Sequence, residues 1–345
     1  MKFLSDKALQ RLRETSADPD LAGTRYRLLE RVARGGMGVV YAAQDEMLDR
    51  RVALKVLDAP DLDGTLAARL NREARVLARL EHPGIVPVHD VGTLPDGRVF
   101  YTMKFVEGQP LDKHIASVTS LPDRLRMFLR ICDSVAFAHS RGVLHRDLKP
   151  SNIMVGAFGE VLVMDWGLAK ILREPSLADA SRDPDATSYQ APDSVATEGS
   201  SPPQTHAAES TGHGTVLGTP GYMSPEQARG EINQLDQRSD VYSLGAILKF
   251  LCTETAPPSS GSAPVGKALT AIWTKAMAGN PADRYATAEA LALDVSRYLD
   301  GLPVSARKET LLEKAARFYR RYNVAILLLL AYLAMRALLL LFFHR

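Results

Sequence analysis

Two short motifs at a fixed spacing constrain this chain more than any other feature. His145-Arg-Asp-Leu-Lys-Pro-Ser-Asn152 is followed by Asp165-Trp-Gly167, so that Asn152 comes five positions after Asp147 and Asp165 comes thirteen positions after Asn152. One carboxylate can accept a proton, and an amide and a second carboxylate can supply oxygen ligands to Mg²⁺ beside a triphosphate. The spacing therefore predicts a fold that gathers these three side chains around a nucleotide.

Two weaker signals lie upstream of these motifs. Glycines in Val32-Ala-Arg-Gly-Gly-Met-Gly-Val-Val40 allow the backbone to approach phosphates, although such a hairpin is also an ordinary turn. Lys55 in Val-Ala-Leu-Lys is costly among apolar strand residues unless its ammonium meets an anion, although on an edge strand it would be a plain surface lysine. Taken alone, neither signal decides between its two interpretations.

The pattern along the chain predicts a small β-rich lobe followed by a larger helical one. A polar lead-in, 1–25, precedes strand-like runs in 26–107, which one amphipathic helix interrupts at 66–80. In the large lobe, 108–300, helical periodicity covers 121–141, 237–252 and 268–279. The insert 171–215 is rich in Ser, Thr, Asp and Pro and has few large apolar residues, so we expect it to be disordered or conditionally ordered.

Composition excludes several classes of protein. The formal net charge of +2 gives no field that would attract nucleic acid, so no nucleic-acid partner is expected. The two cysteines, Cys132 and Cys252, lie far apart without metal-ligand spacing, which favours a reducing compartment over a disulfide scaffold. The first residues lack a long apolar core, so no signal peptide is expected.

Taken together and in order, the motifs over residues 26–299 resemble those of the protein kinase superfamily, and most closely the bacterial serine/threonine kinases of eukaryotic (Hanks) type. The resemblance implies an α+β, bilobal fold. A small lobe with a five-stranded antiparallel sheet and one helix would precede a mainly helical lobe, with ATP in the cleft between them. The implied reaction transfers the γ-phosphoryl of ATP, with Mg²⁺ or alternatively Mn²⁺, to serine or threonine hydroxyls of proteins.

The resemblance also implies roles for individual residues. Lys55, paired with Glu73, would contact the α and β phosphates, and Asp147 and Lys149 would act at the acceptor hydroxyl and the transferring phosphoryl. Asn152 and Asp165 would bind the metal ion. The nucleotide would contact a wider set, formed by the glycine-rich segment, the roof, back and floor of the adenine pocket, and the backbone that follows: Val32, Ala33, Arg34, Gly35, Gly36, Met37, Gly38, Val40, Ala53, Lys55, Met103, Lys104, Val106 and Met154.

Other residues of the pattern are expected to support these groups. Thr219 would support Asp147 and Lys149, as in relatives that phosphorylate serine or threonine. Glu226 and Arg284 would form a buried pair in the large lobe, and Asp240 would brace the catalytic loop.

The sequence departs from the family pattern at four places. Ala33 stands where a glycine is usual, and Trp166 stands where a phenylalanine is usual. The long insert 171–215 suggests autophosphorylation near Thr211 or Thr215, with Arg146 pairing with the phosphate; the less favoured alternative is a passive linker. The stretch between Cys252 and Lys267 is shorter than usual, which leaves substrate docking in question. Two alternatives to a protein kinase activity therefore stay open. The first is a membrane-anchored nucleotide-binding pseudokinase scaffold, and the second, less favoured, is phosphorylation of a small molecule.

The C-terminal residues predict attachment to a membrane. Residues 323–343 form an apolar run, interrupted by Tyr332 and Arg336, that is long enough to cross a bilayer as a helix. The preceding segment, 301–322, carries basic residues that favour a kinase domain on the cytoplasmic side of the cell (inner) membrane, with a single crossing. Arg336 is costly within a span, so an interfacial helix or a buried helix in an oligomer is the alternative. A homodimer is also compatible with this segment.

Overall fold

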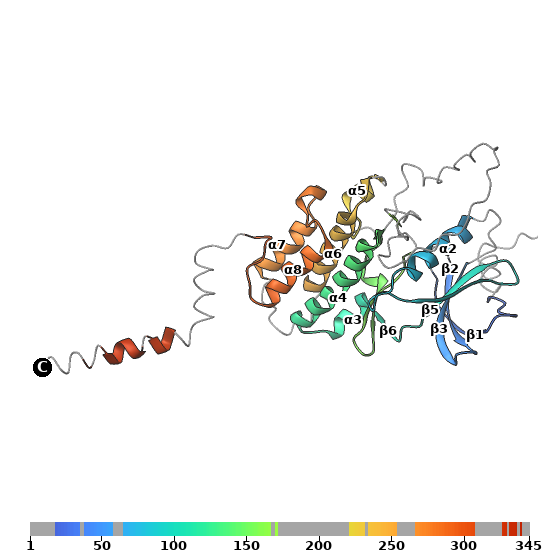
Figure 1. The fold of residues 1–345 in the computed structure, drawn as a ribbon, viewed down its shortest axis with the longest axis horizontal. Helices are drawn as coiled ribbons and strands as arrows, with labels where there is room; N and C mark the ends of the chain where they lie inside the picture. The colour runs from blue at the N-terminus through green and yellow to red at the C-terminus, as the bar shows by residue number, and fades with distance from the viewer. Residues whose placement is uncertain are drawn as a thin grey trace, which may run out of the picture.

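The computed structural model describes residues 18–34, 38–57, 65–166, 170–171, 221–231, 234–253, 266–307, 326–329, 331–336 and 339. Several predictions therefore lie outside the described residues: those on Gly35, Gly36, Met37, Thr219, nearly all of the insert 171–215, and the shortened stretch after Cys252. The described chain forms a small lobe built on a sheet and a larger lobe built on helices (Figure 1). This two-lobed α+β arrangement confirms the expected fold class.

The small lobe is a five-stranded antiparallel sheet with the strand order β1-β2-β3-β5-β4. Its strands are β1 (Tyr26–Arg34), β2 (Gly38–Asp45), β3 (Arg50–Leu57), β4 (Val88–Thr93) and β5 (Val99–Lys104). Because side chains alternate along a strand, Val52, Leu54 and Val56 of β3 join one apolar cluster. Ala53 and Leu57 join the other, with Lys55 between them in sequence. Lys55 is thereby placed on the face that meets helix α2.

Helix α2 (Thr65–Ala78) matches the amphipathic helix expected at 66–80. Leu70, Ala74 and Leu77 follow helical spacing and are buried in the cluster that includes Ala53 and Leu57. Glu73 lies on the same side and is also buried. The apolar stripe therefore fixes the direction in which the carboxylate of Glu73 points.

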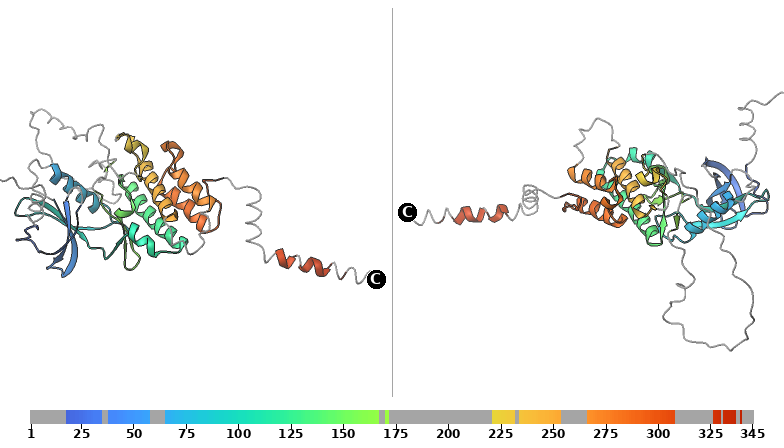
Figure 2. Two further views of the ribbon diagram at one scale, coloured as in Figure 1. Left: turned by 180° about the vertical axis from the view of Figure 1, so that it is seen from behind. Right: turned by 90° about the horizontal axis from the view of Figure 1, so that it is seen from above.

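The large lobe is mainly helical. The helices expected at 121–141, 237–252 and 268–279 are confirmed as α4 (Leu121–Ser140), α6 (Gln237–Thr253) and α7 (Lys267–Ala276). The sequence prediction omitted α8 (Ala288–Leu299), although its buried Ala288, Leu291 and Val295 follow helical spacing. Smaller elements complete the lobe: α3 (Leu111–His114), α5 (Pro225–Ala228), the sheet of β6 (Gly108–Pro110), β8 (Ile153–Gly156) and β9 (Val161–Val163), and the pair β7 (Val143–Leu144) with β10 (Lys170–Ile171). Two further views show α4, α6, α7 and α8 gathered at the end of the molecule away from the sheet (Figure 2).

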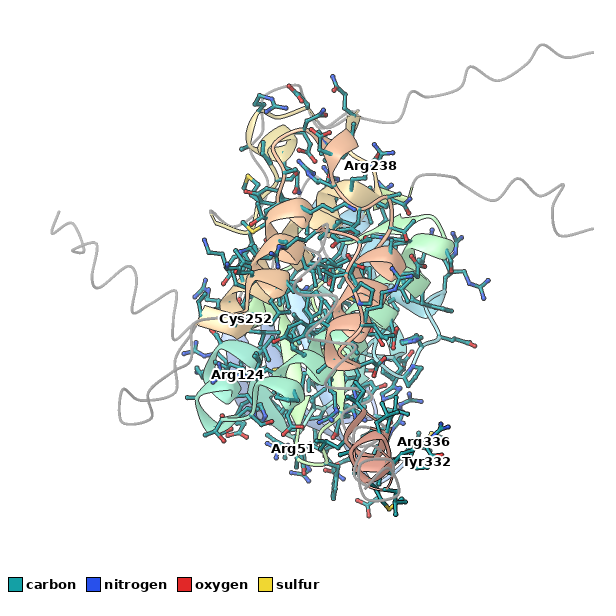
Figure 3. All side chains as sticks on the ribbon, turned by 90° about the vertical axis from the view of Figure 1, so that its left-hand side faces the viewer. Arg51, Arg124, Arg238, Cys252, Tyr332 and Arg336 are labelled. Carbon is teal, nitrogen blue, oxygen red and sulfur yellow. The ribbon has the colours of Figure 1, made fainter. Side chains whose placement is uncertain are left out.

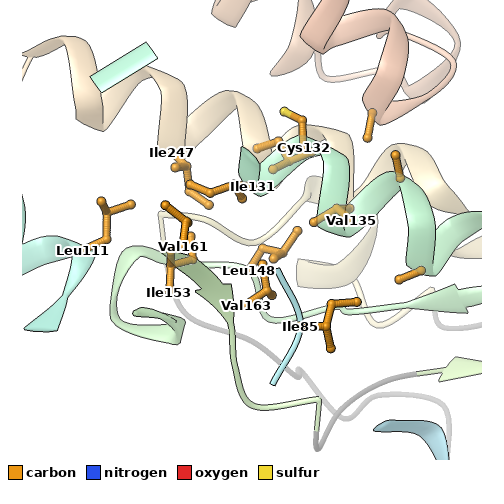
Figure 4. Packing of buried hydrophobic residues seen from close by; sticks show 14 of the residues in the cluster. Ile85, Leu111, Ile131, Cys132, Val135, Leu148, Ile153, Val161, Val163 and Ile247 are labelled. Atoms are coloured by element: carbon orange, nitrogen blue, oxygen red, sulfur yellow. The ribbon is translucent and has the colours of Figure 1, made fainter. Parts of the chain in front are cut away.

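One cluster of buried apolar side chains spans both lobes. In the large lobe, Ile131 and Val135 of α4 meet Val161 and Val163 of β9, with Ile247 of α6 nearby (Figure 4). Each such side chain contributes about 1.5–3 kcal/mol through burial. The cluster also includes Leu148, Ile153 and Trp166, so it anchors the segments that carry the motifs found in the sequence.

Helices α6 and α7 approach closely because of Gly245. A Cβ atom at this position would lie 2.7 Å from the Cβ of Ala276, closer than packed carbon atoms allow. Glycine is therefore required here by packing.

The chain is held at both edges of the described domain. Before β1, Pro19 is buried and Leu21 packs against the outer cluster of the sheet. After α8, the buried carboxylate of Asp294 accepts hydrogen bonds from Ser305 N and Oγ and from Ala306 N, at 2.7, 2.8 and 3.0 Å. The packed domain thus includes Pro19 and Leu21 before β1 and Ser305 and Ala306 after α8.

The C-terminal residues that are described, 326–329 and 331–336, are helical and exposed. Tyr332 and Arg336 lie near each other on this segment (Figure 3). Within the described part of the chain, no helix has both the length and the apolar character needed to span a bilayer. Much of 301–322 and of 323–343 lies outside that part.

Candidate active site

Lys55 on β3 and Glu73 on α2 form a buried ion pair. The Lys55 Nζ atom lies 2.8 Å from Glu73 Oε1 and 3.1 Å from Oε2. It also lies 3.5 Å from Asp165 Oδ1, which belongs to the large lobe. Burial alone would lower the pKa of Lys55, but the two carboxylates raise it above its usual value, so the ammonium stays charged. The pair predicted from the sequence is therefore present and reaches across the lobes.

Glu73 has a second donor that the sequence analysis did not identify. The buried phenol of Tyr101, on β5, donates to Glu73 Oε1 at 2.8 Å. Burial and then the charge of Glu73 raise the pKa of Tyr101 well above its usual value, so the phenol remains protonated. The signal available in the sequence was alternation, because Tyr101 shares a face of β5 with Met103.

The catalytic loop between β7 and β8 brings Asp147, Lys149 and Asn152 together. Asp147 Oδ2 accepts from Lys149 Nζ at 2.8 Å and from Asn152 Nδ2 at 3.2 Å. Asn152 Nδ2 also donates to the backbone oxygen of Asp147 at 2.9 Å. Because the amide nitrogen is committed to Asp147, the amide oxygen, which is the atom a cation needs, points the other way.

Asp240, at the start of α6, braces this loop as predicted. Its buried carboxylate accepts from the backbone N–H groups of His145 and Arg146, each at 2.9 Å, and bonds His139 Nε2 at 2.8 Å. Burial would raise the pKa of Asp240, but the hydrogen bond and charge of His139 outweigh it and lower the pKa. Arg146 has a φ of 71°, a costly conformation that these bonds help to maintain. The contribution of His139 was not foreseen from the sequence.

Asp165 follows β9 in a second strained conformation, with a φ of 57°. Its side chain is 50% exposed, whereas the neighbouring Trp166 is buried. The Trp166 indole donates to Val163 O at 3.3 Å, and its ring lies 4.6 Å from that of His145. Trp166 thus anchors the segment in the core, while the side chain of Asp165 is half exposed and lies near Lys55.

The residues present suit a magnesium ion. Mg²⁺ is commonly bound through one or two carboxylates together with substrate phosphates, and it keeps several waters. Asn152 and Asp165 supply such a partial set of oxygens. Among the side chains that the structure describes, no group of three or more His, Cys, Asp or Glu could hold a metal ion. A magnesium ion bound together with substrate phosphates does not need a complete set of protein ligands.

The residues expected to contact the nucleotide come from both lobes. Ala53 and Met103 are buried, Val40, Val106 and Met154 are partly buried, and Val32, Ala33, Arg34 and Lys104 are exposed.

Two backbone features refine this pocket. The Lys104 N–H donates to Pro87 O at 3.1 Å, so its carbonyl is the group that can bond a base. A Cβ atom at Gly38 would lie 2.2 Å from the carbonyl oxygen of Val56, so this glycine is also required by the pairing of β2 with β3.

The predicted pair of Glu226 and Arg284 is confirmed as a buried, bidentate ion pair. Arg284 Nη1 and Nη2 lie 2.7 and 2.8 Å from the two carboxylate oxygens of Glu226. Ser239 Oγ donates to Glu226 Oε1 at 2.8 Å. This cluster joins α5, which carries Glu226, to the start of α6 and to the segment before α8.

Comparison with known proteins agrees with this geometry. The protein kinase domain family matches residues 26–270. The serine/threonine-protein kinase PknD of Chlamydia trachomatis is 35% identical over 338 aligned residues, which cover 88% of this chain and 34% of that protein. PknD of Chlamydia caviae is 34% identical, with 81% and 32% covered. The chain thus spans about a third of the length of these relatives.

Solved structures lead to the same family. The kinase domain of PknI from Mycobacterium tuberculosis superposes with a TM-score of 0.53 at 26% identity, covering 81% of this chain and 96% of that domain. This chain therefore belongs to the protein kinase domain family.

Proposed function

We propose that this chain transfers the γ-phosphoryl group of Mg-ATP to serine or threonine hydroxyls of proteins. The observation that carries the proposal is the convergence of two charge systems across the lobes. The pair of Lys55 and Glu73 from the small lobe lies 3.5 Å from Asp165, measured from Lys55 Nζ to Oδ1. Asp147, Lys149 and Asn152 of the large lobe form one hydrogen-bonded group.

Each of these residues has a distinct task in such a reaction. Asp147 orients the acceptor hydroxyl and accepts its proton, while Lys149 offsets negative charge on the transferring phosphoryl. Lys55, held by Glu73, binds phosphate oxygens. Asn152 and Asp165 hold Mg²⁺, which would neutralise phosphate charge when bound. The geometry thus supports phosphoryl transfer by positioning and electrostatics.

Two observations favour serine or threonine as the acceptor. Lys149 contacts Asp147 directly, where it can stabilise the transferring group on an aliphatic hydroxyl. The matched relatives named above are serine/threonine kinases.

Phosphate transfer with labelled ATP and Mg²⁺ tests the proposal directly. The purified chain and its Asp147→Asn variant are incubated with generic protein substrates. We expect incorporation into serine or threonine by the wild type and a loss of at least about 100-fold in the variant, since groups of this kind contribute about 3–4 kcal/mol to catalysis. Nucleotide binding by both proteins without labelling of any substrate would instead favour the pseudokinase scaffold.

Two finer proposals follow from the sequence. The insert 171–215 is a candidate for autophosphorylation, which mass spectrometry of the active protein would locate; an unmodified insert in active protein would contradict it.

The apolar residues 323–343 are proposed to attach the chain to the inner membrane with the kinase domain in the cytoplasm. Membrane fractionation before and after deletion of this segment tests that location.

A further inference from the structure

Tyr101 lies at a position where three elements of the small lobe meet. In the pairing of β3 with β5, Lys55 and Tyr101 are direct partners, so their side chains emerge side by side on the face toward α2. Glu73 comes from α2, and its Oε1 atom accepts from Lys55 Nζ and from Tyr101 Oη, each at 2.8 Å. The three side chains form a closed triangle, with the ammonium also 5.7 Å from the centre of the phenol ring.

The two donors on Glu73 differ in what else they must do. Lys55 also lies near Asp165 and, in the proposed reaction, turns its ammonium toward phosphate oxygens. Tyr101 has no such second task in that reaction, because its phenol is buried and faces the carboxylate from the side of β5. Its hydrogen bond can therefore hold Glu73 in one orientation while Lys55 exchanges partners.

We propose that Tyr101 is a positioning residue for phosphoryl transfer: its phenol fixes the carboxylate of Glu73, and so helix α2, against β5 independently of Lys55. The expected effect on phosphoryl transfer rests on the proposed function. The holding of Glu73 and α2 against β5 does not. A hydrogen bond to a charged, buried acceptor is stronger than a neutral one, and loss of the donor leaves a carboxylate oxygen less well satisfied.

The variant Tyr101→Phe removes the hydroxyl and keeps the ring. We expect kcat to fall about tenfold, with the KM for ATP changed less than about twofold, because the adenine contacts remain while the lysine is less well placed in the transition state. In a Glu73→Gln background the same substitution should change kcat less than about twofold, since the phenol acts through Glu73.

Tyr285→Phe is the matched control. Tyr285 is also buried and donates to a carboxylate, that of Asp294, at 2.8 Å, but it lies in the large lobe away from the reacting groups. We expect this variant to lower the melting temperature and to leave kcat and KM unchanged. If Tyr101→Phe behaves in the same way, Tyr101 is only a stabilising residue and the proposal is wrong.

Hydrogen–deuterium exchange of the full chain separates this proposal from the proposed function. Tyr101→Phe should speed exchange in α2 (Thr65–Ala78) at least about threefold relative to wild type, while Tyr285→Phe should not. This result does not require the wild type to phosphorylate anything, so an inactive wild type would defeat the proposed function and leave the positioning of α2 measurable. Unchanged exchange in α2 would overturn the inference. So would an effect of Tyr101→Phe on kcat that is as large in the Glu73→Gln background as in the wild type.

Discussion

The buried pair of Glu226 and Arg284 gives the large lobe a measurable sensitivity to acid. Burial would raise the pKa of Glu226, but hydrogen bonds from Arg284 and Ser239 lower it from the usual 4.5 to about 2. Since one pH unit corresponds to about 1.4 kcal/mol, the ionised carboxylate contributes about 3 kcal/mol to the free energy of unfolding. Because the folded-state pKa lies below the unfolded value, this contribution is complete above about pH 5 and is lost as the pH falls toward about 2.

The variant Glu226→Gln isolates the effect because its side chain cannot ionise. Between about pH 6 and about pH 3.5, the wild type should lose about 1.4 kcal/mol more unfolding free energy than the variant. Urea denaturation at each pH, followed through the fluorescence of the buried Trp166 and Trp273, measures both proteins.

Glu231→Gln serves as the control for this measurement. Glu231 pairs with Arg229 at the surface, where water screens the interaction, so its substitution should change little. Parallel pH dependences for wild type and Glu226→Gln would refute the reasoning, because they would mean that the pair contributes nothing through the charge of Glu226.

Three further substitutions test other parts of the structure. Asp240→Ala leaves the buried N–H groups of His145 and Arg146 without their acceptor, which costs about 1–3 kcal/mol for each group, so kcat should fall about tenfold or more. An unchanged kcat would mean that the loop keeps its conformation without Asp240. Gly245→Val forces side-chain atoms against Ala276 and should lower the unfolding free energy by about 1–3 kcal/mol in urea, whereas wild-type stability would contradict the close packing of α6 and α7. Trp166→Phe keeps an apolar aromatic ring, although it loses the bond to Val163 O and fills less of the core, so kcat should stay within about threefold of wild type; a larger fall would mean that the whole indole is needed to hold Asp165 in place.

Much of the site could be predicted because its residues lie in local patterns. Lys55 is in a buried strand whose side chains alternate between two apolar clusters, and Glu73 is in a helix whose apolar stripe sets its direction. Asp147 and Asn152 share one short loop. In each case the local structure fixes the direction of the side chain, and the resemblance to protein kinases indicated that Lys55 would pair with Glu73.

The residues that were missed depend on contacts between distant segments. Tyr101 meets Glu73 across 28 positions, and His139 meets Asp240 across 101. A buried tyrosine on a strand and a histidine near the end of a helix are ordinary core residues in any sequence pattern. Only the folded arrangement shows that each one completes the hydrogen bonding of a buried carboxylate.

The attachment of residues 305–306 to Asp294 has a mechanical consequence. A pull on the chain beyond Arg307 reaches the domain at Ser305 and Ala306, whose three hydrogen bonds to one carboxylate are loaded together. Bonds loaded in parallel must break together, so tension would be carried into the middle of α8 and would not peel that helix open from its end. Since α8 packs against α4, and α4 contacts α6, β7 and β9, the load would be spread through the whole helical core.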